Sequence, residues 1–258
     1  MSLNIVVCVK SVINAIWSGK WTRTKENSGL NPFDRPVVEM ARSLVDEHGG
    51  EVTLLSMGPD SASYALYQAM AMGADHAILV CDKALKGSDT YVTATVLGAA
   101  LKIIPDVDIV LFGTRSSDSD TGHVGPQTAE MLELPIVTNI FKVSIKDKKF
   151  FVENKVDGYI EQYEGICPAV FTVNPSFMES GHTGLHEIEN TFREKTLDIW
   201  DLKQIGLDPS RTGAHASPTK IISLNKEKKQ EKCHFIQGSM EEKAEALTEQ
   251  LKKSGMVV

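Results

Sequence analysis

Small, hydroxylated and acidic residues gather in one loop, at residues 113–126. The loop follows the apolar run 108–112, which indicates a buried strand, and it precedes residues 127–133, which indicate a helix. Glycines let a backbone approach a phosphate closely, and free N–H groups at a helix start favour an anion. A loop of this kind at the carboxyl end of a parallel strand is typical of nucleotide sites. Taken alone, the pattern suits a polar connection as well as it suits a ligand-binding loop.

Two further loops and one lysine strengthen the ligand-binding interpretation. Met57-Gly58-Pro59 and Gly87-Ser88-Asp89-Thr90 each follow a predicted strand, and Lys10 follows the first strand. In a doubly wound sheet these strand ends converge on one edge and form a single crevice. We therefore expect a nucleotide-type binding crevice at this edge.

Several side chains in these loops have more than one role open to them. Asp89 and Thr90 suit the start of their own helix whether or not they contact a ligand. Asp118 and Asp120 suit a helix cap, a ribose contact or a solvated position. His123 suits a ligand contact no better than it suits exposure to solvent.

The chain lacks the motifs that would assign a reaction to its own side chains. The GxGxxG fingerprint, the GxxxxGK[ST] P-loop, HExxH, CxxC and a Ser-centred elbow are all absent from the sequence. The seven histidines show no metal-ligand spacing. The residues therefore indicate a nucleotide-binding protein without evident chemistry of its own.

Strand and helix patterns alternate through most of the chain. This alternation predicts an α/β fold: a doubly wound, mostly parallel sheet with an antiparallel extension and an extended C-terminal arm. The predicted strands are residues 4–9, 51–56, 76–80, 108–112, 135–138, 141–145, 149–155, 160–164 and 169–173. Helices are expected between Asp34, as the N-cap, and Gly49, and at residues 61–72, 91–103, 127–133 and 240–253.

The chain is expected to divide into two functional parts. Residues 1–178 are predicted to form a nucleotide-binding α/β domain, and residues 179–258 a partner-docking loop followed by a C-terminal arm with a terminal helix. The sequence after Asn174 is polar and has no clear period. Residues 206–218, rich in Ser, Gly, Pro and Thr, indicate a linker or an extended arm.

Composition excludes several classes of protein. The 258 residues carry a formal net charge of −7, which argues against binding to nucleic acid or to anionic membranes. No apolar run is long enough for a transmembrane helix, and the N-terminus does not resemble a secretory signal. The four cysteines are widely spaced, as expected for reduced thiols. We therefore expect a cytoplasmic protein without membrane insertion.

With these motifs in view, the chain resembles the beta subunit of electron-transfer flavoproteins. The resemblance covers nearly the whole chain in the same order. The matching elements are Val7-Cys8-Val9-Lys10, Asn31-Pro32-Phe33-Asp34, Met57-Gly58-Pro59, residues 69–75, Gly87-Ser88-Asp89-Thr90, residues 118–126, Pro168-Ala169-Val170 and Ser217-Pro218-Thr219.

The resemblance implies a heterodimer with an alpha subunit that carries one FAD. It favours the electron-bifurcating branch, in which the beta subunit binds a second FAD and accepts hydride from NADH, while the cofactor supplies the redox chemistry. The alternative is a non-bifurcating beta subunit with structural AMP. A third possibility is a stand-alone, stress-type nucleotide-binding protein.

The resemblance also assigns residues to the cofactor and to a partner. The expected cofactor-binding residues are Val9, Lys10, Asn31, Asp34, Met57, Gly58, Asp89, Thr90, Gly113, Asp118, Asp120, Thr121, Val124, Gly125 and Pro126. Thr90 and Thr121 are expected at phosphates, and Asp34 at a ribose or in loop ordering. Leu185 falls where the family places an apolar anchor for an acyl-CoA dehydrogenase-type or other redox partner, although a loop pinned to its own domain suits it equally.

Overall fold

A computed structural model describes residues 2–13, 24, 27–176, 183–223 and 235–256. Contacts divide the chain into two compact units, Met1–Lys220 and Ile221–Val258, and each is considered by itself. The first unit continues well past residue 178, where the sequence placed the end of the nucleotide-binding domain. In the second unit the helix α7 (Met240–Lys253) has the predicted bounds, and a capping box of Ser239 and Glu242 fixes its start.

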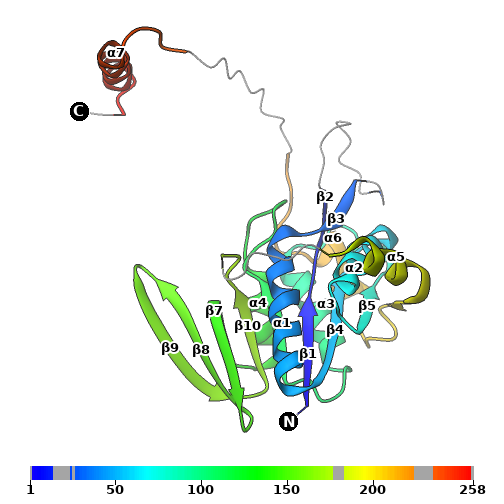
Figure 1. Ribbon diagram of the computed structural model, residues 1–258. Helices are drawn as coiled ribbons and strands as arrows, with labels where there is room; N and C mark the ends of the chain where they lie inside the picture. Colours follow the sequence, from blue (N-terminus) through cyan, green and yellow to red (C-terminus); the bar gives the residue numbers. More distant parts are fainter. Residues whose placement is uncertain (1, 14–23, 25–26, 177–182, 224–234, 257–258) are drawn as a thin grey trace. The chain divides into compact units, whose positions relative to one another are not determined.

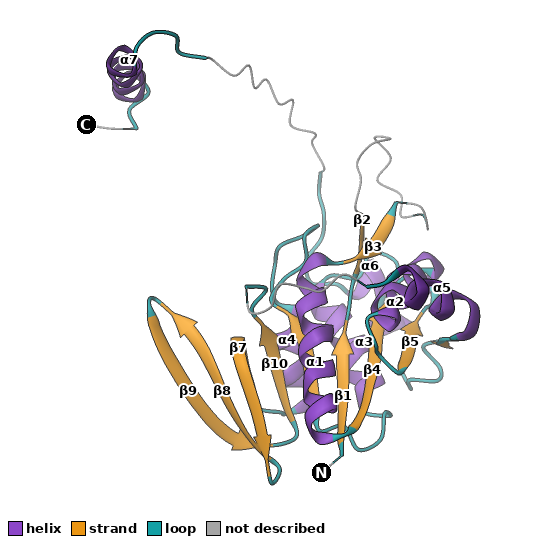
Figure 2. Ribbon diagram, in the orientation of Figure 1, coloured by secondary structure: helices purple, strands orange, loops and turns teal. Residues whose placement is uncertain are grey.

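The first unit is built on a nine-stranded sheet. In spatial order its strands are β11 (Asp198–Trp200), β5 (His76–Val80), β4 (Gly50–Met57), β1 (Leu3–Cys8), β6 (Ile109–Gly113), β10 (Ala169–Val173), β7 (Ile136–Lys146), β8 (Lys149–Val156) and β9 (Tyr159–Ile166). Neighbours from β11 to β7 pair in parallel, whereas β7–β8 and β8–β9 pair antiparallel. Figure 2 shows these last strands extending one edge of the sheet. The predicted α/β fold with an antiparallel extension is confirmed.

Helices cover both faces of the parallel part (Figure 1). They are α1 (Arg35–His48), α2 (Ser63–Ala71), α3 (Thr90–Leu101), α4 (Val124–Leu132), α5 (Leu185–Glu194) and the short α6 (Gly213–Ala216). Short 3-10 turns lie at η1 (Pro32–Asp34), η2 (Asp60–Ala62), η3 (Lys83–Leu85) and η4 (Pro209–Arg211). A separate antiparallel pair, β2 (Ser11–Ile13) with β3 (Ser28–Leu30), follows β1.

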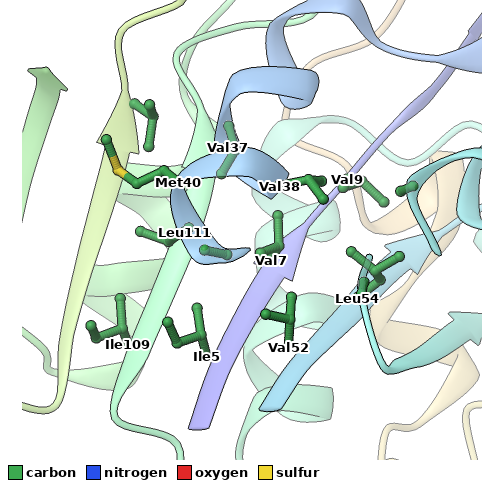
Figure 3. Packing of buried hydrophobic residues seen from close by; sticks show 14 of the residues in the cluster. Ile5, Val7, Val9, Val37, Val38, Met40, Val52, Leu54, Ile109 and Leu111 are labelled. Carbon is green, nitrogen blue, oxygen red and sulfur yellow. The ribbon is translucent and has the colours of Figure 1, made fainter. Parts of the chain in front are cut away.

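In the parallel part of the sheet both faces are buried, which explains why β1, β6 and β10 are apolar almost along their whole length. Ile5 and Val7 of β1 pack in a cluster with Val37 of α1 (Figure 3). Val6 and Cys8, which alternate with them, pack on the opposite side in a cluster with residues of α3 and α4. The parallel strands β1, β4, β5, β6 and β10 therefore each contribute to two cores, whereas β9 in the antiparallel extension is exposed.

Two strand expectations need correction. Residues 135–138 and 141–145 were expected as separate strands, but they belong to the single strand β7, which pairs in parallel with β10 and then antiparallel with β8. A bulge near Ile140, with Asn139 at φ 58°, lets the strand change partners. The expected strand 169–173 is present as β10, but it lies inside the parallel sheet between β6 and β7 rather than in the extension.

The polar region after Asn174 contains more structure than its sequence indicated. Helix α5 packs on α2, where Phe192 lies 5.0 Å from Tyr67 and 5.3 Å from Tyr64 between ring centroids. Strand β11 adds to the sheet edge. Residues 206–218, expected as a linker or an extended arm, are instead part of the first unit, where Thr212 and Ser217 are buried. Tertiary contacts order segments whose local pattern is weak.

Two consecutive glycines end α1, as expected, and they allow a matched stability test. Gly50 has φ +126°, and an added Cβ would overlap the Leu3 carbonyl, whereas Gly49 has φ +73° with nothing within 4 Å. We expect Gly50→Ala to lower the free energy of unfolding by about 3 kcal/mol, and Gly49→Ala by only about 1 kcal/mol. Urea unfolding measures both. Equal losses would contradict the close approach at Gly50.

Candidate functional site

The strand order places a topological switch point between β1 and β6. The chain runs outward from β1 through β4 to β5, then returns to β6 on the other side of β1. Open α/β sheets bind ligands at the carboxyl ends of the strands that flank such a point. The residues that follow these two strands are Lys10 and the loop 114–123.

Lys10 attaches this loop to the end of β1. Its Nζ lies 2.6 Å from Asp118 Oδ1, 3.1 Å from Ser116 Oγ and 3.3 Å from Ser119 Oγ. An ammonium group has three N–H donors, so these contacts occupy all of them. The arrangement makes Lys10 a residue that orders the loop, and it neutralises one of the two acids that the sequence singled out.

Asn31 supports the loop from beneath. Its side chain is buried; Nδ2 donates to Arg115 O at 3.0 Å, and Oδ1 accepts from Ser117 N at 3.2 Å. Nδ2 also donates to Asp34 Oδ1 at 2.9 Å. A buried amide with these bonds fixes the loop backbone, because leaving any of them unmade would cost free energy.

Asp34 completes the buried network, in an arrangement that suits loop ordering, one of the two roles expected for it. It precedes α1 but makes no side-chain cap; instead its Oδ2 accepts from the backbone N of Lys10 at 2.7 Å. The residue is 3% exposed, so the geometry favours loop ordering over a ribose contact. Gly113 passes so close that an added Cβ would overlap Asp34 Oδ1.

The buried position changes the acidity of Asp34. Burial raises the pKa of this carboxyl from 3.8 to about 7, against the opposing effect of hydrogen bonds from Lys10 and Asn31 and of the Lys10 charge. The nearby Asp118 carboxylate contributes to this rise in the pKa of Asp34. The carboxyl group of Asp34, next to the end of β1, therefore titrates near neutral pH.

The start of α4 is open toward the same edge. The helix begins at Val124, before the expected residue 127, and no side chain of the described residues caps it. The N–H groups of Val124 and Gly125 have no acceptor within the helix and are left for water or an anion, whereas Pro126 has no N–H group. Before it, Asp120 and Gly122 have φ 54° and 66°, and Arg115 Nη1 lies 3.2 Å from Asp120 Oδ1.

Gly125 has a packing role within α4. It is buried, and an added Cβ would lie 3.0 Å from Thr172 Cγ2 and 3.3 Å from Phe112 Cγ. This close contact places the helix against β6 and β10. The neighbouring predicted residues, Thr121 and Pro126, are more accessible: Thr121 is exposed and Pro126 half-buried.

The other predicted cofactor residues lie at neighbouring strand ends. Val9 is buried, and its backbone N donates to Leu55 O at 2.9 Å, so it offers no free N–H group. Met57 ends β4, and the N of Gly58 donates to Val80 O at 3.1 Å. Asp89 caps α3 at Val92 N, 3.0 Å away, as its sequence position suggested.

The starts of α3 and α4 share one shallow depression of about 440 Å³. It is lined by Tyr91, Pro126, Gln127, Glu130 and Met131. Thr90 begins α3 beside it. The structure thus brings Lys10, Asn31, Asp34, Gly113 and Asp118 into one network, while Asp89 and Thr90 stand at the adjoining helix start.

Leu185, the expected anchor for a partner, is the first residue of α5 and is 86% exposed. The expected docking loop is thus partly helical from this residue onward. Residues 177–182, which belong to the same expected loop, lie outside the described part of the chain. The alternative of a loop pinned to its own domain also stays a prediction, since α5 packs on α2 while the Leu185 side chain is exposed.

Sequence reasoning missed the residues that complete the site. Ser116 and Ser119 bind Lys10, and the Arg115 guanidinium lies 4.8 Å from the centroid of the Phe33 ring. The signal for the two serines was the density of hydroxyl groups in one loop; the pairing with Lys10 needed the fold. Among the described residues, no group of His, Cys, Asp and Glu forms a metal site, and no helix is long and apolar enough to cross a membrane.

The acidity of Asp34 predicts a pH-dependent contribution to stability. Between about pH 4 and pH 7 the native state keeps a proton that the unfolded state has released. The stability contributed by Asp34 is therefore greatest below pH 4 and falls as the pH rises through 7, by up to about 1.4 kcal/mol per pH unit. The amide that replaces this carboxyl in the Asp34→Asn variant cannot titrate. The unfolding free energy of the wild type minus that of the variant should therefore fall as the pH rises from about 4 to about 7. Parallel pH profiles in urea unfolding would contradict the raised pKa.

Comparisons with known proteins agree with this geometry. A family model described as "Electron transfer flavoprotein domain" matches residues 19–203. The electron transfer flavoprotein subunit beta of Thermoanaerobacterium thermosaccharolyticum is 33% identical over 255 residues, covering 96% of this chain and 98% of that protein.

Two further relatives carry other names. The caffeyl-CoA reductase-Etf complex subunit CarD of Acetobacterium woodii is 35% identical over 227 residues, with 85% of this chain and 86% of that protein covered. Protein FixA of Azorhizobium caulinodans is 34% identical over 231 residues, with 84% and 82% covered. The chain therefore belongs to the electron transfer flavoprotein family, among its beta subunits.

Proposed function

We propose that the edge between β1 and β6 binds the nucleotide part of FAD, and that the chain transfers electrons as one subunit of a heterodimer with an alpha subunit. The observation that carries the proposal is the ordered loop 114–123, which Lys10 holds against β1 just before the uncapped start of α4. Backbone N–H groups at a helix start suit a diphosphate.

The residues present fit such a group. Gly122 has φ +66°, and a Cβ there would lie 2.9 Å from Thr114 O, so only glycine suits this turn. Lys10 neutralises Asp118, which lessens the repulsion that a phosphate would meet at this edge. Thr121 is exposed beside the helix start and is our candidate for a phosphate hydrogen bond.

The protein's part is to bind and orient. Asn31 and Asp34 fix the loop backbone, so its N–H groups point in set directions before a ligand arrives. When bound, FAD would supply the electron-transfer chemistry. Protein side chains need only hold the nucleotide and exclude alternatives, which agrees with a sequence without a catalytic motif.

Electron bifurcation with NADH as donor is the finer proposal. It is supported by the resemblance of the C-terminal arm and of three elements to bifurcating members of the family: Met57-Gly58-Pro59, Gly87-Ser88-Asp89-Thr90 and Val124-Gly125-Pro126. A relative named as a subunit of a caffeyl-CoA reductase-Etf complex supports a CoA-ester reductase or dehydrogenase as partner, with Leu185 as a contact. Structural AMP without bifurcation is the alternative; a stand-alone stress-type protein no longer fits, because the chain belongs to this family.

Acid release of nucleotides from the co-purified native heterodimer tests the proposal. We expect two FAD and no AMP per heterodimer, because the beta-subunit site would hold FAD in addition to that of the alpha subunit. One FAD with one AMP would support the structural-AMP alternative. A heterodimer that carries no nucleotide in the beta subunit would overturn both.

A lysine variant tests the site itself. Lys10→Met keeps a long side chain but removes the ammonium that holds Asp118, Ser116 and Ser119, so we expect about tenfold faster nucleotide loss on dilution. Lys142→Met is the matched control, because its Nζ lies 3.0 Å from Glu153 Oε1 on the β7–β8 hairpin. Equal retention by both variants would place the nucleotide elsewhere.

A further inference from the structure

The segment that follows η4 interlocks with the loop before α3. The N of Gly213 donates to Ser88 Oγ at 3.2 Å, and the N of Ala214 donates to Lys86 O at 3.1 Å. Gly213 has φ +71°, and an added Cβ would overlap the Ala84 carbonyl. Residues more than 120 positions apart in sequence therefore pack backbone against backbone.

Asp89 joins this segment directly to α3. Its Oδ1 accepts from Val92 N at 3.0 Å as the cap of the helix, and its Oδ2 accepts from Thr219 N at 2.8 Å. Its own backbone N donates to Ser217 Oγ, 2.9 Å away. Both carboxylate oxygens of Asp89 thus accept hydrogen bonds from the protein backbone. Asp89, which was expected to contact the cofactor, joins this segment to the start of α3.

Ser217 is the second fastening point, and it is buried. Its Oγ donates to Gly213 O at 2.8 Å while it accepts from Asp89 N. Although partial burial opposes the effect, hydrogen bonds from Val92 and Thr219 lower the pKa of Asp89. The charged form accepts these hydrogen bonds best, so the fastening holds at neutral pH.

The fastened segment holds the start of α3, which shares a depression with the start of α4, where we propose that the nucleotide binds. Tyr91, two residues after Asp89, lines the depression that the start of α3 shares with Pro126 and Gln127 at the start of α4. Any shift of the α3 start would change the shape of that depression. The segment ends at Lys220, where the first compact unit ends.

We propose that residues 209–220 act as a strap that closes on the start of α3 through Asp89 and Ser217, and that the strap holds the nucleotide crevice in its binding shape. The inference rests on the proposed function, because it concerns retention of the same nucleotide. Asp89 and Ser217 are positioning residues here: they act through the α3 start and its neighbour Tyr91.

Two variants release the strap in different ways. Asp89→Asn retains an oxygen to cap Val92 but turns an N–H group toward Thr219 N, so the strap bond is lost while the helix cap survives. Ser217→Ala removes the hydroxyl that links Asp89 N to Gly213 O and leaves α3 untouched. Asp208→Asn is the matched control, because Asp208 caps only η4 within the segment, through Ser210 N at 2.8 Å.

The experiment uses the native heterodimer and measures two rates for each variant. One is trypsin cleavage after Arg211 and Lys220, both exposed in the strap. The other is the loss of bound nucleotide after dilution. We expect Asp89→Asn and Ser217→Ala to increase both rates about tenfold, as for one charge-assisted hydrogen bond, and Asp208→Asn to change neither.

The outcomes separate the strap from the function on which it rests. Faster cleavage with unchanged nucleotide loss would overturn the role of the strap in the crevice, and unchanged cleavage in both variants would overturn the fastening itself. Wild-type heterodimer that carries no beta-subunit nucleotide would overturn the proposed function and the strap's role with it. If Asp89→Asn does not fold, Ser217→Ala alone decides the matter.

Discussion

A buried carboxyl group at the end of β1 is the constraint on which the rest of the site depends. Asp34 accepts hydrogen bonds from the Lys10 backbone and from the Asn31 amide, and it has almost no access to water. A buried polar group of this kind is stable only when its partners are held in place. The need to satisfy it fixes where β1 ends, how Asn31 points and why residue 113 is glycine.

From that point the order spreads outward to the loop 114–123. Asn31 bonds the loop backbone at two positions, and Lys10 bonds three side-chain oxygens in it. Asp118, Ser116 and Ser119 therefore bind Lys10, and Asp120 binds Arg115. What remains for an anion is Thr121 and the backbone at the uncapped start of α4, and helix starts commonly bind phosphates in this way.

A carboxyl group that accepts hydrogen bonds from two segments is found again at the start of α3. Asp89 caps α3 and also holds the backbone of Thr219, so one carboxylate joins a helix start to a segment 130 residues away in sequence. At both places a charged side chain fixes a connection between distant segments. In the proposed nucleotide crevice such contacts would form before a ligand binds, which reduces the ordering cost of binding.

Much of the fold followed from the sequence because its signals are local. Apolar runs of five or six residues and helical spacing predicted the parallel strands β1, β4, β5, β6 and β10 and the helices α1 to α3, and the terminal helix α7 had the expected bounds. The loops that flank the switch point were found because glycines, hydroxyls and helix starts mark them. Family resemblance named the same loops, and the comparisons showed the family.

Tertiary structure alone decided which of these residues bind one another and which stay accessible. Nothing local reveals that Asp34 is buried, that Lys10 meets Asp118, or that β10 lies inside the sheet, because each depends on contacts between distant segments. For the same reason α5 and the strap escaped the sequence pattern: their stability comes from packing on α2 and on the loop before α3. The sequence by itself determined the elements and the edge at which they converge; the fold decided the hydrogen-bond partners, since those are set by distances in space rather than by spacing along the chain.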